Sequence, residues 1–407
     1  MITRSAPVWA IQCAQFSLLF SCFFVPLSTA LMNIAYFSTI LLSLCGGKQV
    51  FSKALRNPAS ILISLVTLLY FMGSFYSIAP LRDIIDGLRK HSWLFCAPLL
   101  LGLPLSMAWR RYALNAFLLA VGIVLVLSYL KFWGLLSIGE KFTQASVFKN
   151  HISQNFLSAF ACAIFAYRFL HYPNKWRYFY LIVALLTAYN VLFMSLGRTG
   201  YALFFLLLGI VILQYAHYKG LLLSLLIIGS LASFSYYYSA SFKMRIKTVL
   251  SDTLEYAAQP RTISSMSIRY NEYQNTWKLM KQHPGLGYGT GSVRTAFEKL
   301  PALYPDATHI SHRPAISNST ESVYLNILLQ FGWCGLLIFV GVFGGLGWLS
   351  RYITHPEMRF VFSAYLISFL VGACATDWIT TPPESRLLSL LCVLGLGGIR
   401  RTVAVRG

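Results

Sequence analysis

The stretch NSTESVYLNILLQFGWCGLL, residues 318–337, places one carboxylate, Glu321, where a polar segment turns into a long apolar run. A carboxylate in such a place can accept the proton of an attacking hydroxyl group. Asn318 gives the same acid a second interpretation, because the pattern N-x-x-E is typical of a capping box at a helix N-terminus. The sequence therefore leaves Glu321 as a general base or as a helix cap, and the two roles are compatible.

Two histidines in the motif THISHRP, His309 and His312, are alternative candidates for the base. An imidazole titrates closer to neutral pH than a carboxylate does, which favours it as a proton acceptor. The H-x-x-H spacing also raises the possibility of metal binding, but two histidines alone are weak evidence for a site that needs three or four ligands. We expect no metal here.

Arginine supplies a planar fork of donors that suits phosphate oxygens. Arg198, in SLGRTGYALFFLLL, stands at the start of an apolar helix near the expected headgroup depth, where a snorkelling interface arginine is the alternative. Arg269 lies at the start of a helical pattern over residues 268–282, where a solvated helix face is the alternative. Lys281 and Arg294 are neighbours that could steer an anionic lipid.

The elements that position these residues are expected to cross a membrane. Of the 407 residues, 57% are hydrophobic and only 11% are charged, whereas a soluble domain carries about a quarter charged residues. The apolar residues come in blocks of about 20, the length that crosses a bilayer core. We predict an all-α polytopic membrane protein with about twelve transmembrane helices. The expected spans are 8–26, 28–46, 59–78, 92–107, 112–132, 153–170, 178–196, 199–217, 220–238, 321–349, 360–379 and 384–399.

The distribution of charge gives these spans an orientation. With the N-terminus inside, lysines and arginines dominate the inner segments, and acids such as Asp83, Asp86 and Glu140 fall in outer loops. This positive-inside bias predicts that both termini are cytoplasmic. The net charge of +21 therefore reflects topology and contact with anionic lipid, and we expect no nucleic-acid partner.

One long hydrophilic segment, residues 239–320, separates helices 1–9 (1–238) from helices 10–12 (321–407). The orientation places this basic segment outside the cytoplasm. Its pattern from 268 to 282 predicts an amphipathic helix on the membrane or on the bundle, with Tyr270, Tyr273, Trp277 and Met280 on one side. The following run HPGLGYGTGS lacks the signatures of a Walker or Rossmann loop, and an ordinary loop is the favoured interpretation.

Three motifs occur in order along the second half of the chain. They are SLGRTGYALFFLLL (195–208), SIRYNEYQNTWKLMKQHPGLGYGTGSVRTAF (267–297), and the opening stretch, with its Tyr-Leu pair and with Gly332 and Gly335 spaced as GxxG. The two glycines would allow close packing against another helix. The order of these motifs around a long outer loop resembles the O-antigen ligase and O-antigen polymerase superfamily, with the motifs covering residues 195–340.

The resemblance implies an integral-membrane glycosyltransferase that needs no metal and no cofactor. Its donor is a glycan on undecaprenyl pyrophosphate, and it acts at the periplasmic face of the bacterial inner membrane, among membrane lipids. A ligase moves the glycan to the lipid A core, and a polymerase moves a growing chain onto the next repeat unit. The family's essential arginines fall on Arg198 and Arg269, and the position that is usually His in ligases falls on Glu321. We expect catalysis from Glu321, Arg198, Arg269 and His312, and substrate contacts from Arg294, Lys281, His309 and Tyr324.

Ligase activity is the first interpretation, and a polymerase is the close alternative. A lipid-oligosaccharide transporter is more distant, because the candidate residues gather at one face and no internal repeat is evident. The Glu in place of His leaves room for a non-catalytic partner of an envelope assembly. Asp377, late in the expected span 360–379, is a further candidate, because acids within membrane segments are functional by default.

Overall fold

The computed structural model describes residues 8–139, 145–258, 265–300 and 319–399. Within these ranges the chain consists of helices and their connections, without any β-strand. Each of the twelve expected spans contains a helix. These are α1 (Val8–Phe24), α2 (Thr29–Cys45), α4 (Pro58–Phe75), α6 (Ser92–Leu100), α7 (Met107–Phe132), α8 (His151–His171), α9 (Arg177–Tyr189), α10 (Arg198–Ala216), α11 (Gly220–Tyr238), α16 (Val323–Leu349), α17 (Pro356–Gly372) and α18 (Pro382–Leu396).

Five helical stretches among the described residues are long and apolar enough to cross a membrane. The helix pair α2 and α3 (Gly47–Arg56), bent by 106°, raises this number to six. The all-helical class with several membrane-capable helices is therefore confirmed, and the number of twelve stays a prediction. Helix α6 has nine residues, about 14 Å of helix, which is less than the bilayer core requires.

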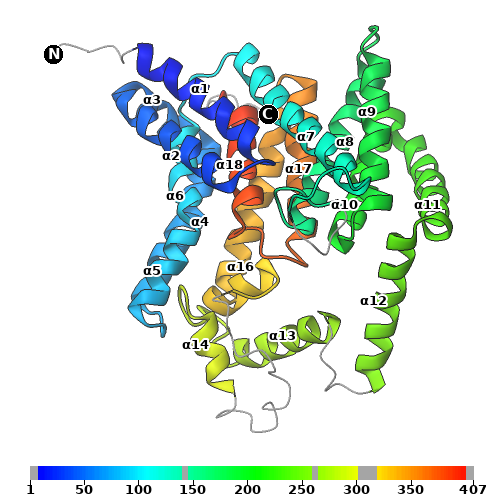
Figure 1. Ribbon diagram of the computed structural model, residues 1–407. Helices are drawn as coiled ribbons and strands as arrows, with labels where there is room; N and C mark the ends of the chain where they lie inside the picture. Colours follow the sequence, from blue (N-terminus) through cyan, green and yellow to red (C-terminus); the bar gives the residue numbers. More distant parts are fainter. Residues whose placement is uncertain (1–7, 140–144, 259–264, 301–318, 400–407) are drawn as a thin grey trace.

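Four further α-helices lie in the lower half of Figure 1, the first on its left, the second on its right and the last two at the bottom of the bundle. They are α5 (Leu81–Lys90), α12 (Ala240–Ala258), α13 (Ser265–Met280) and α14 (Val293–Glu298). Three of them come from the hydrophilic segment 239–320, and α13 crosses beneath α16 in Figure 1. This end of the bundle carries the residues that the sequence singled out for chemistry.

The centre of the bundle is formed by α8 and α18, whose residues are buried along most of their length. Aromatic rings link α8 to α17 and to the connection that follows it. Phe156 lies 4.3 Å from Trp378 between ring centroids, and Phe160 lies 5.0 Å from Tyr365. Packing of this kind fixes the bundle beneath the site.

The expected packing role of the two glycines in α16 is wrong, because Gly332 interrupts the helix instead. Its φ of +61° is left-handed, and a Cβ there would lie 2.4 Å from the carbonyl oxygen of Gly285. The loop 284–289 fills the break and takes over hydrogen bonds that the helix leaves open. The amides of Trp333 and Cys334 donate to Pro284 and Gly285 (2.9 and 3.3 Å), and those of Tyr288 and Gly289 donate to Leu329 and Gln330 (3.0 and 2.7 Å).

The glycine run is therefore a structural insert into α16. Its glycines at 287, 289 and 291 also have positive φ and lie against backbone of α4, α5 and α16. The amide of Gly291 donates to the side chain of Gln330 at 2.7 Å. The ordinary-loop interpretation fits this arrangement, since several of the loop amides are used within the protein.

Candidate active site

Arg198 is the first residue of α10 and is held in place by α8. The preceding residue, Gly197, accepts a hydrogen bond at 3.1 Å from the side-chain amide of Asn155. A Cβ at Gly200 would lie 2.4 Å from the same amide group, so the two helices meet closely here. The guanidinium of Arg198 is mostly buried and lies 3.6 Å from the carboxylate of Asp252 on α12. This distance is long for an ion pair.

Arg269 on α13 forms the second part of the site. Its Nε atom lies 2.9 Å from Oε2 of Glu321, and both side chains remain partly exposed. The carboxylate of Glu272, on the same helix, accepts a hydrogen bond of 3.0 Å from the backbone amide of Glu321. Helix α13 therefore holds Glu321 through its side chain and its backbone.

The capping interpretation of Glu321 is wrong in the structure. Helix α16 begins at Val323 with Ser322 as the N-cap residue, so Glu321 lies outside its first turn. Asn318 lies outside the described residues. Glu321 is thus part of the connection that enters α16, and its side chain turns toward α13.

The positive charges of Arg245 and Arg269 both act on Arg198 through space. We name these three arginines, with Asp252 and Glu321, the arginine site. It joins the two arginines and the acid that the sequence singled out, although they come from α10, α13 and the start of α16. Arg245 was not recognised as a candidate from the sequence.

The other expected site residues have separate environments. Tyr324 donates its hydroxyl to the carbonyl of Leu370 at 2.9 Å. Lys281 lies 5.7 Å from the ring centroid of Trp277, and Arg294 pairs with Glu298 at 3.1 Å on the exposed face of α14. His309 and His312 lie outside the described residues.

The aromatic side chains of α13 stay partly exposed to the surroundings of the protein. Tyr270, Tyr273 and Trp277 are 37%, 44% and 48% exposed, whereas Leu279 and Thr276 are buried. The predicted stripe is therefore divided, because Met280 is buried and two of the rings contact the bundle. Tyr273 donates to the carbonyl of Cys374 at 2.9 Å, and Trp277 lies 6.4 Å from Trp333 between ring centroids. Of the two alternatives given by the sequence, α13 shows the contact with the bundle, and part of its aromatic surface stays exposed.

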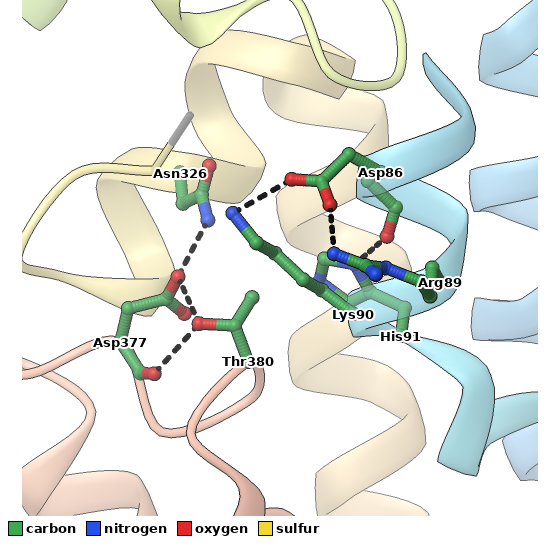
Figure 2. A network of polar contacts seen from close by, with 8 residues as sticks. Asp86, Arg89, Lys90, His91, Asn326, Asp377 and Thr380 are labelled. Atoms are coloured by element: carbon green, nitrogen blue, oxygen red, sulfur yellow. Dashed lines mark hydrogen bonds and ion pairs between the residues drawn. The ribbon is translucent and has the colours of Figure 1, made fainter. Parts of the chain in front are cut away.

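Asp377 forms a second polar cluster at the same end of the bundle (Figure 2). Helix α17 ends at Gly372, earlier than the expected span 360–379, so Asp377 lies in the connection to α18. Its carboxylate accepts hydrogen bonds from Asn326 at 3.1 Å and from Thr380 at 2.8 Å. Burial raises the pKa of Asp377 to about 6, because removal from water disfavours its charged form.

Helix α5 borders this cluster from the other side. Figure 2 shows Lys90 extending from α5 toward Asn326, with its ammonium group 3.0 Å from the carboxylate of Asp86. The hydrogen bond from Lys90 holds the pKa of Asp86 below its ordinary value. Within the described part of the chain, no three His, Cys, Asp or Glu side chains gather as metal ligands would.

Residues 181–340 match a family model described as O-antigen ligase. This segment belongs to the O-antigen ligase and polymerase superfamily. The match confirms the resemblance drawn from the three motifs, and it supports glycan transfer of the ligase or polymerase type with lipid-linked substrates. The O-antigen ligase segment contains the whole arginine site, whereas Asp377 lies beyond its end. No sequence among the curated proteins is significantly similar to the chain.

Proposed function

We propose that this protein is an O-antigen ligase, which transfers a glycan from undecaprenyl pyrophosphate to the lipid A core. The observation that carries the proposal is the arginine site, where the charge of Arg269 acts on Arg198 and Arg269 itself pairs with Glu321. The family match over residues 181–340 supplies the reaction class. The sequence supplies the expected orientation of this end toward the periplasm.

In this reaction, the bond between the glycan's anomeric carbon and the diphosphate oxygen breaks, and undecaprenyl pyrophosphate leaves with the bonding electrons. An acceptor hydroxyl oxygen forms the new bond to the same carbon and loses its proton. Arg198 and Arg269 stabilise the charge that grows on the leaving diphosphate. Glu321 accepts the hydroxyl proton.

The contact between Arg269 and Glu321 connects the group that stabilises the leaving diphosphate with the group that accepts the hydroxyl proton. While Arg269 holds the carboxylate at 2.9 Å, Glu321 is a restrained proton acceptor. A diphosphate offers more negative charge than one carboxylate and competes for the same guanidinium. Binding of the donor then draws Arg269 toward phosphate and leaves Glu321 available to the acceptor hydroxyl.

The proposal includes the finer topology expected from the sequence. With twelve spans, both termini lie on the cytoplasmic side of a bacterial inner membrane. Residues 239–320 then form a periplasmic segment between helices 1–9 (1–238) and helices 10–12 (321–407). The reaction needs neither a metal nor a cofactor, since pyrophosphate is already a good leaving group.

A polymerase is the second candidate, and one observation favours it. The residue that pairs with Arg269 is Glu321, at a position where the family resemblance places His in ligases. The same leaving group and the same proton transfer would serve extension of a lipid-linked chain. The two candidates differ in the acceptor.

Deletion of the gene, followed by a gel of surface polysaccharide, separates these functions. Loss of a ligase leaves unligated lipid-linked polymer and a bare core, whereas loss of a polymerase leaves core that carries one repeat. A normal polysaccharide pattern would contradict both. In a reconstituted assay, Arg198→Ala should abolish transfer, and wild-type turnover of that variant would remove Arg198 from the site.

A further inference from the structure

Arg245 lies on the face of α12 whose side chains reach α10. Phe242, one turn earlier, is buried and lies 5.0 Å from Tyr201 between ring centroids. Asp252, two turns later, reaches Arg198 at 3.6 Å. Positions 242, 245 and 252 share one helix face, so the contacts on either side of Arg245 direct its side chain toward the start of α10.

The start of α12 is fixed on the bundle, which makes this placement definite. The hydroxyl of Ser239 donates to the carbonyl of Leu192 at 2.8 Å, and Ser239 is 2% exposed. The contacts of Phe242 with Tyr201 and of Asp252 with Arg198 place Arg245 between them, and its charge acts on both Arg198 and Tyr201. Arg245 and Arg198 are therefore neighbours, although α11 lies between their helices in the sequence.

Two buried guanidinium N–H groups in this pair have no acceptor among the described residues. They are Nε of Arg245 and one terminal nitrogen, Nη1, of Arg198. Buried donors of this kind are normally satisfied, and a charged group without a partner is especially unfavourable. Asp252 offsets only Arg198, and it does so at a distance longer than a normal hydrogen bond. Both donors are therefore suited to an anionic ligand.

We propose that Arg245 is a third cationic arm of the donor site and binds the diphosphate together with Arg198 and Arg269. This inference rests on the proposed function and adds a residue to it. A diphosphate ester presents several oxygens on two phosphorus atoms, which more than one arginine fork can bind in parallel. Arg245 acts in binding and in stabilising the leaving group, and it takes no part in proton transfer.

The test measures binding of inorganic pyrophosphate to the full chain in phosphatidylcholine nanodiscs by calorimetry. We expect Arg245→Ala to raise the Kd for pyrophosphate about tenfold, since it removes one charged hydrogen-bonding partner. The KM for the lipid-linked donor should rise in parallel. Lys247→Ala, on the same helix but exposed, removes the same charge and should leave both constants unchanged.

Two further variants keep the inference separate from the proposed function. If Arg198→Ala weakens pyrophosphate binding and Arg245→Ala does not, Arg245 is no part of the site and the proposed function stands. If both variants bind pyrophosphate like the wild type, the arginine site holds no diphosphate and the proposed function loses its main support. Arg245→Lys keeps the charge and should bind between the wild type and Arg245→Ala.

The source of the anion and the folding of the variants are also controlled. If phosphatidylglycerol in the nanodisc abolishes pyrophosphate binding to the wild type, the site binds lipid headgroups and the inference is overturned. Each variant is compared with the wild type by size-exclusion profile and Tm. If Arg245→Ala is misfolded, Arg245→Gln replaces it and must show the same loss of binding.

Discussion

Arg269 and Glu321 form a 2.9 Å ion pair between α13 and the connection that enters α16. The two residues are 52 positions apart in the sequence. The pair therefore connects two distant points of the chain. It also joins the two groups expected to act on the donor and on the acceptor. The role of the Glu321 carboxylate in this pair is therefore the first to be tested.

Substitution of Glu321 by Gln should lower kcat by about 100-fold or more, the contribution typical of a general base. The amide keeps the size of the side chain and can still accept a hydrogen bond from Arg269, so donor KM and Tm should change little. Glu298→Gln, at the exposed ion pair on α14, is the matched control and should retain activity. Full activity of Glu321→Gln would instead direct attention to His312 as the base.

Gly332→Ala should destabilise the protein by about 2 kcal/mol or more, because φ is +61° there and a Cβ would meet the Gly285 carbonyl at 2.4 Å. A Cβ at Gly341, in the same helix, would have open space around it, with no other part of the described chain within 4 Å. Gly341→Ala should therefore be neutral or slightly stabilising. Thermal unfolding in detergent compares the two, and an equal Tm for both variants would contradict the role of the break.

Asp377 should make stability fall as pH rises from about 4 to about 6. Its folded-state pKa of about 6 lies above the ordinary value of 3.8, so the folded protein binds a proton that the unfolded chain has released in this window. The effect is at most about 3 kcal/mol. Asp377→Asn should remove this slope in a series of Tm measurements against pH.

Asp86 provides a control of opposite sign, because its pKa is lowered by the hydrogen bond from Lys90. Its contribution to stability is present above the ordinary carboxyl pKa and is lost on acidification. Asp86→Asn should therefore reduce Tm slightly at neutral pH and have no effect in acid. If Tm depends on pH in the same way in both asparagine variants, burial of Asp377 is not the cause of the fall in stability between about pH 4 and about pH 6.

A buried ion pair far from the arginine site should affect stability without affecting chemistry. Arg168 on α8 donates to Glu357 on α17 at 2.6 Å and to Asn115 at 2.7 Å, and Tyr172 donates to the same carboxylate at 2.9 Å. Arg168→Ala should cost about 3–5 kcal/mol, because it leaves a buried acid without its cation. The kcat of the folded fraction should stay at the wild-type level, and a selective loss of kcat would contradict a purely structural role.

The helical class and the chemistry of two arginines could be predicted from the sequence because both depend on local patterns. Blocks of apolar residues indicate membrane helices whatever surrounds them, and Arg198 stands out at the start of such a block. The resemblance then related Arg198 to Arg269 and Glu321. In the structure Arg269 pairs with Glu321, and its charge acts on Arg198. This grouping of the three residues could be predicted because it depends on the order of motifs along the chain, which a single sequence shows.

Other features depend on tertiary contacts and were misread or missed. The N-x-x-E pattern predicted a cap at Glu321, but α16 begins at Val323, and Glu321 contacts α13 through its side chain and its backbone. The glycine pair in α16 indicated helix packing, since a positive φ at Gly332 leaves no mark in the sequence. Arg245 was one basic residue among many in 239–320. Its spacing from Phe242 and Asp252 was the available signal, and its meaning required the position of α10.

The insertion of loop 284–289 into α16 has a consequence for biogenesis. Until this loop docks, two carbonyls and two amides around Gly332 have no partner within their own helix. Exposure of such groups to the lipid core is unfavourable by several kcal/mol each. The newly synthesised α16 therefore cannot satisfy its own backbone, and docking of loop 284–289 becomes a step in its maturation.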